Sequence, residues 1–134
     1  MVPVPVTLAT AAAAVLVNMW LSWRISRLRH ELNVSVGDGG QEPLLRRMRA
    51  QANFIEYAPL FLILLAGLEL SGANRIALAI IATLFILARI AHGVGMDGGD
   101  AQIWRRIGMP LTGLASVVLA FWGLVCALDL CLRG

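Results

Sequence analysis

Residues 54–70 read FIEYAPLFLILLAGLEL, and this apolar stretch, together with three others of similar length, decides the fold. A helix needs roughly 20 apolar residues to span the hydrocarbon core of a bilayer. The other stretches lie at residues 2–23, 76–95 and 107–128. The chain is therefore predicted to be an all-α integral membrane protein, a bundle of four transmembrane helices.

The composition leaves little material for a soluble domain. The chain has 134 residues, of which 59% are hydrophobic and 14% are charged. Soluble domains carry about a quarter charged residues. We expect one membrane domain over residues 1–134, with helices at about 4–31, 43–70, 75–95 and 105–131.

The basic residues predict an orientation. No Lys or Arg precedes Arg24, so the first apolar stretch lacks the basic start of a signal peptide and is expected to be a retained helix. Arginines flank the first connection (residues 24–49) and the third (residues 89–106), whereas the second has only Arg75. By the positive-inside rule, connections one and three face the cytoplasm and both termini face the other side. The net charge of +3 is too small to suggest a nucleic-acid partner.

Other motifs predict structure rather than chemistry. Cys126 and Cys131 point to different sides of a helix and are expected to be unpaired fillers. The sequence has no CxxC, HExxH or Walker-type loop, and residues 97–100 predict a polar turn rather than a calcium site, so no metal is expected. Gly108, Thr112 and Ser116 form a ridge of small residues that favours close helix packing.

The candidate functional face lies on the second helix. Arg49, Asn53, Glu56 and Tyr57 follow one another at i, i+4, i+7 and i+8, which places them on one side of a helix. An ionised group at the bilayer centre costs about 2.5–3.5 kcal/mol even on the lenient insertion scale, so Glu56 needs a partner. Arg89 could reach its carboxylate. The face fits either a ligand that carries a positive and a negative charge at its ends or a structural polar cluster that fixes helix registry.

Residues 49–62, RAQANFIEYAPLFL, resemble the signature of the MAPEG family, membrane-associated proteins of eicosanoid and glutathione metabolism. The resemblance extends over nearly the whole chain. The VGDGG turn at residues 36–40 is similar to that of a bacterial branch, so we expect a bacterial inner membrane protein.

The resemblance implies a homotrimer that binds glutathione between protomers near the cytoplasmic side. It implies glutathione contacts from several helices: Arg49, Asn53, Glu56, Tyr57, Gln51, Arg29, Arg89 and His92. Arg29 could equally be an ordinary interfacial arginine, and His92 a structural histidine.

The resemblance also implies a catalytic arginine at the start of the fourth helix. A nearby cation lowers the pKa of a thiol and so activates it as a nucleophile. Arg106 is the first candidate and Arg105 the alternative. Both could instead be positive-inside anchors.

The expected activity is a glutathione transferase, or a lipid-hydroperoxide peroxidase, acting on lipophilic substrates that arrive from the bilayer. The alternative is a non-catalytic trimer that binds a thiol or lipid. It is motivated by Tyr57 being the only tyrosine, because Met96 and Met109 lie in regions where characterised members often have tyrosines. A small multidrug exporter is disfavoured, because such proteins rely on an acid in the first helix. The first helix of this chain has only Asn18 as a candidate for a buried polar residue.

Overall fold

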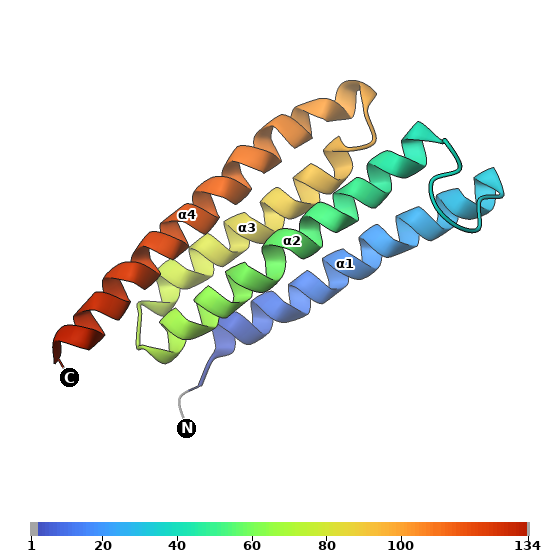
Figure 1. Ribbon diagram of the computed structural model, residues 1–134. Coiled ribbons are helices and arrows are strands. Elements are labelled where there is room, and N and C mark those ends of the chain that lie inside the picture. Colours follow the sequence, from blue (N-terminus) through green and yellow to red (C-terminus); the bar gives the residue numbers. More distant parts are fainter. Residues whose placement is uncertain (1–2, 134) are drawn as a thin grey trace.

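The computed structural model describes residues 3–133. Within this range the chain forms four long helices and a short 3-10 turn, in the order α1 (Pro5–Leu32), α2 (Glu42–Leu70), α3 (Arg75–Gly95), η1 (Gly99–Ala101) and α4 (Gln102–Arg133). The long helices run side by side in an up-and-down bundle, with the two chain ends at the same end (Figure 1). The bundle positions the polar side chains of α2, α3 and α4 relative to one another.

All four long helices are long and apolar enough to cross a membrane. A helix satisfies its own backbone hydrogen bonds, which is the requirement for a chain inside lipid. The outward surface is apolar as well: Leu16, Leu60 and Phe121 are 68%, 67% and 68% exposed. The predicted all-α architecture with four apolar helices is confirmed, and the trimer remains a prediction.

Local sequence signals explain most helix ends. Asn33 ends α1 in the left-handed conformation at φ 55°, which asparagine tolerates better than most residues. The turn after α2 uses Gly72 at φ 83°. Asn74 then caps α3, because its Oδ1 accepts a 3.0 Å hydrogen bond from the backbone N–H of Ala77. The start of α4 differs from the prediction by three residues, since η1 runs directly into Gln102.

Large side chains fill the middle of the bundle. The rings of Phe61 on α2 and Phe85 on α3 stack with their centroids 3.8 Å apart and their planes 10° apart. Leu65 on α2 and Leu119 on α4 are fully buried beside them. This contact packs α2 directly against α3 in the middle of the bundle.

The predicted small-residue ridge lies between α3 and α4. A Cβ atom on Gly108 would lie 2.6 Å from the carbonyl oxygen of Ala88, so only glycine permits this approach. Thr112 is buried one turn later, and its hydroxyl donates to the carbonyl of Gly108 at 2.8 Å. Ser116 is half-buried and donates to the carbonyl of Thr112. Close packing of α4 on α3 through the predicted ridge is thus confirmed.

A buried carboxylate closes the end of the bundle where the chain begins. Glu69, near the end of α2, is 1% exposed. Its oxygens accept hydrogen bonds from the backbone N–H groups of Val6 at 3.0 Å and Thr7 at 2.8 Å, and from the Thr7 hydroxyl at 2.8 Å. Glu69 therefore supplies the cap that the first turn of α1 lacks, since Val4 makes no side-chain capping bond.

Cys126 and Cys131 are both free thiols, as predicted.

Candidate functional site

The polar segment of α2 meets α3 through a buried arginine. Arg89 is 1% exposed, and its Nη2 donates a 2.8 Å hydrogen bond to Oδ1 of Asn53. The carbonyl of the Asn53 amide therefore points into the bundle. Its NH2 group remains available as a donor for another partner.

Other groups around Arg89 come from α2, α3 and α4. Nη2 of Arg89 lies 3.3 Å from Nδ1 of His92, and Nη1 lies 3.4 Å from the hydroxyl of Thr112. Its guanidinium carbon lies 5.7 Å from the ring centroid of Tyr57 and 6.0 Å from that of Phe54. Within residues 3–133, Nε of Arg89 has no hydrogen-bond partner and no carboxylate pairs with this side chain. Neutral dipoles and aromatic faces thus surround a buried cation.

The remaining members of the predicted face point outward. Arg49, Glu56 and Tyr57 are all exposed. None of them makes a side-chain hydrogen bond or an ion pair in the part of the chain that the structure describes. Glu56 is not paired with Arg89, which is bonded to Asn53 instead. The expected partner of Glu56 is therefore not found on the helices of this same chain.

Two predicted contacts are engaged elsewhere in the bundle. Nε2 of Gln51 donates to Oδ1 of Asn18 on α1 at 3.2 Å, so this side chain joins α1 to α2. Nη2 of Arg29 lies 3.5 Å from the sulfur of Met48, while Nη1 is buried with no partner among the described residues. Neither side chain lies in the group around Arg89.

The two candidate catalytic arginines lie in the first turns of α4. Arg105 and Arg106 are exposed and make no hydrogen bond or ion pair with any described residue. A Cβ atom on Gly95, the last residue of α3, would overlap the backbone of Arg105. The start of α4 thus packs directly against the end of α3, one helical turn beyond His92.

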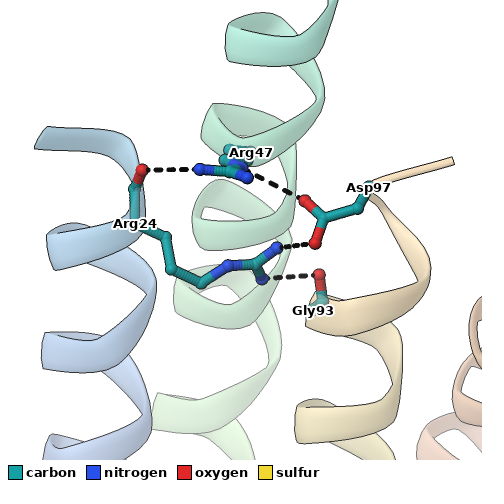
Figure 2. Close-up of polar contacts among 4 residues, drawn as sticks. All are labelled: Arg24, Arg47, Gly93 and Asp97. Carbon is teal, nitrogen blue, oxygen red and sulfur yellow. Dashed lines mark hydrogen bonds and ion pairs between the residues drawn. The ribbon is translucent and has the colours of Figure 1, made fainter. Parts of the chain in front are cut away.

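An ion cluster that was not predicted from the sequence lies at this end of the bundle. Asp97 was expected to be part of a polar turn, but its carboxylate pairs with Arg24 of α1 and with Arg47 of α2, as Figure 2 shows. Nε of Arg47 lies 3.1 Å from Oδ1 of Asp97, and Arg24 binds Oδ2. Nη1 of Arg24 also donates to the carbonyl of Gly93 at 2.8 Å. One carboxylate therefore joins three helices.

A signal for this cluster was present in the sequence. Arg24 and Arg47 border the first connection, and Asp97 is the first acid after the third apolar stretch. In the predicted topology all three lie at the same membrane surface, where an acid among arginines is expected to form ion pairs.

Comparison with known proteins agrees with this architecture. The model of the MAPEG family matches residues 7–125. The chain is also similar to the Inner membrane protein YecN of two Escherichia coli strains, with 30% identity over 109 residues. The aligned region covers 81% of this chain and 82% of that protein.

Proposed function

The chain belongs to the MAPEG family, and from that premise we propose that it is a glutathione-dependent membrane enzyme. It is a transferase that joins glutathione to lipophilic electrophiles, with lipid-hydroperoxide reduction as a close variant. The observation that carries the proposal is the outward polar face of α2. Arg49, Glu56 and Tyr57 are exposed on α2 and make no side-chain hydrogen bond or ion pair in the described chain. Polar groups at membrane depth need a hydrogen-bond or ion-pair partner, and a ligand bound between protomers supplies that partner.

The side chains on this face fit the groups of glutathione. The guanidinium of Arg49 can clamp a carboxylate with two hydrogen bonds. Glu56 can hold an ammonium group. Asn53 accepts from Arg89 through its carbonyl, which leaves its NH2 group to donate to a peptide carbonyl.

The activating group in this proposal is Arg106, with Arg105 as the alternative. A guanidinium beside the thiol stabilises the thiolate, which is the reactive form. The thiol proton passes to water, and the thiolate sulfur then attacks the electrophilic carbon. A carbon–sulfur bond forms, and the leaving group departs with its electron pair.

The assembly and setting belong to the same proposal. Three protomers place glutathione between neighbouring subunits, close to the surface where Arg105 and Arg106 lie. The similarity to an inner membrane protein of Escherichia coli supports an inner-membrane location. The arginines around connections one and three favour a cytoplasmic position for both, because the positive-inside rule counts basic residues near helix ends. Glutathione then enters from the cytoplasm and the electrophile from the bilayer.

The test is ultraviolet difference absorbance of the detergent-purified protein titrated with glutathione at neutral pH. We expect a saturable thiolate band that is lost in Arg106→Ala and kept in Arg133→Ala, an exposed arginine at the other end of α4. If the band survives in Arg106→Ala but disappears in Arg105→Ala, the role moves to Arg105. If calorimetry detects no glutathione binding, the proposed function is wrong.

A second candidate is a non-catalytic trimer that binds a thiol or lipid ligand. It is favoured by the presence of one tyrosine in the chain, Tyr57. Glutathione binding by calorimetry without a thiolate band would support this candidate over the enzyme.

A further inference from the structure

Asp97 lies where the chain turns from α3 into α4. It follows the last residue of α3, Gly95, by two positions, and α4 begins at Gln102. The connection between them contains η1 and two glycines in the left-handed region, Gly98 at φ 87° and Gly99 at φ 56°. A short connection with two glycines has little stiffness of its own, so its position depends on what holds it.

The carboxylate of Asp97 is the group that holds it. Arg47 approaches one carboxylate oxygen and Arg24 the other, from two helices that do not belong to the hairpin (Figure 2). The two arginines are themselves joined, because Nη1 of Arg47 donates to the carbonyl of Arg24 at 3.0 Å. The Asp97 side chain is 38% exposed, whereas its two partners are more buried, at 9% for Arg24 and 26% for Arg47, so water reaches this cluster from the Asp97 side only in part.

The anchorage extends to the first turns of α4. Gly95 lies so close to the backbone of Arg105 that a methyl group could not be inserted between them. Gly108, one turn further along α4, also lies close to the backbone of α3, at Ala88. A displacement of the α3 end therefore displaces Arg105 and Arg106 with it.

We propose that Asp97 is a positioning residue: through Arg24 and Arg47 it fixes the α3–α4 hairpin and thereby the place of the Arg106 guanidinium beside bound thiol. The activation step rests on the proposed function, whereas the anchorage of the hairpin does not. Asp97 contacts no ligand in this account. Its charge is matched by two arginines that have no assigned role in glutathione binding.

The direction in which the pKa of bound glutathione shifts distinguishes a positioning role of Asp97 from a direct effect of its charge. Asp97→Asn removes a negative charge near the site, which by charge alone would favour the thiolate and lower the pKa of bound glutathione. Loss of position moves Arg106 away from the sulfur and raises that pKa. The two explanations therefore predict opposite shifts.

The experiment compares Asp97→Asn with Asp97→Glu and Asp100→Asn in the detergent-purified protein. Asp100 lies in the same connection, is exposed and makes no side-chain hydrogen bond among the described residues, so it serves as the matched control. The pH dependence of the thiolate band gives the pKa of bound glutathione. We expect Asp97→Asn to raise the pKa of bound glutathione by about one unit. At a pH below the pKa of both proteins, the thiolate fraction is then about tenfold smaller in the variant. Asp97→Glu should restore most of the loss, and Asp100→Asn should leave the pKa unchanged.

Hydrogen exchange of the unliganded protein gives a second readout that needs no glutathione. We expect amides of residues 98–106 to exchange about tenfold faster in Asp97→Asn, with α1 and α2 unchanged away from the cluster. If Asp97→Asn does not fold, Arg47→Gln keeps the Arg24–Asp97 pair and should show the same changes at smaller size.

Each outcome bears on one of the two proposals. Unchanged exchange in the hairpin, or a lowered pKa of bound glutathione, overturns the role of Asp97. Absence of glutathione binding in the wild-type protein overturns the proposed function, while faster exchange in the hairpin would still support the anchorage.

Discussion

Arg89 on α3 donates a 2.8 Å hydrogen bond to the amide oxygen of Asn53 on α2, so the one fully buried cation of the described bundle is held by a neutral side chain. This bond orients Asn53 at the inner edge of the outward polar face. It links the packing of α2 and α3 to the presentation of a donor for a ligand. Substitutions can separate the side chains that hold the bundle together from those proposed to bind glutathione.

Asn53→Leu should lower the free energy of unfolding by about 1.5–3 kcal/mol, because it removes the acceptor of a hydrogen bond from a charged group and leaves that group buried. Asn53→Asp keeps an acceptor at the same place and supplies a charge opposite to that of Arg89, so it should retain the stability of the parent. Denaturant unfolding in a fixed detergent measures both variants. Equal stability of all three proteins would contradict a structural role for this bond.

Glu56→Gln should leave the melting temperature unchanged, because the side chain is exposed and makes no hydrogen bond within the described chain. In the proposed function the same change weakens glutathione binding at least about tenfold, since an amide pairs poorly with an ammonium group. Calorimetry measures the affinity and thermal unfolding the stability. A large loss of stability with unchanged affinity would assign Glu56 to the structure instead.

Glu69→Ala should destabilise the protein by about 2 kcal/mol, near the upper end of measured capping effects, because the first turn of α1 loses three hydrogen bonds. Asp129→Ala is a suitable control, since Asp129 forms only an exposed pair with Arg133. Its effect should be below about 0.5 kcal/mol. Similar losses in the two variants would show that the cap contributes little.

Gly108→Ala should cost about 1–3 kcal/mol, because the added methyl group overlaps the backbone of α3. Gly113→Ala on the same helix meets no atom within 4 Å and should cause no loss. Unfolding of the two variants under identical conditions makes the comparison. Tolerance of alanine at position 108 would mean that α4 can move away from α3 at little cost.

The sequence was sufficient for the helices but not for their side-chain partners. Four apolar stretches of membrane-spanning length define the helices without any knowledge of packing, and the spacing of Gly108, Thr112 and Ser116 marked a real contact. The partner of Asn53 depends on how α3 is rotated against α2, two helices that also meet where Phe61 stacks on Phe85. No local pattern contains that angle.

Asp97 and Glu69 were missed for a related reason. Asp97 stands among glycines and has the local appearance of a turn residue, while its partners lie 73 and 50 positions away. Glu69 sits at the end of an apolar run, and the amides that it binds lie 62 and 63 positions away. Such contacts form only after the helices have assembled: the topology could bring Asp97 to the same membrane surface as Arg24 and Arg47, but no local pattern pairs Glu69 with the amides of α1.

The contact of Glu69 with the first turn of α1 has a consequence for biogenesis. α1 leaves the ribosome before Glu69 is synthesised, so the amides of its first turn cannot receive this cap until α2 has been made. The same carboxylate lies 3.8 Å from Nε of Arg75, at the start of α3. The cap therefore forms only when α1 and α2 lie side by side, and neither helix can make these hydrogen bonds alone.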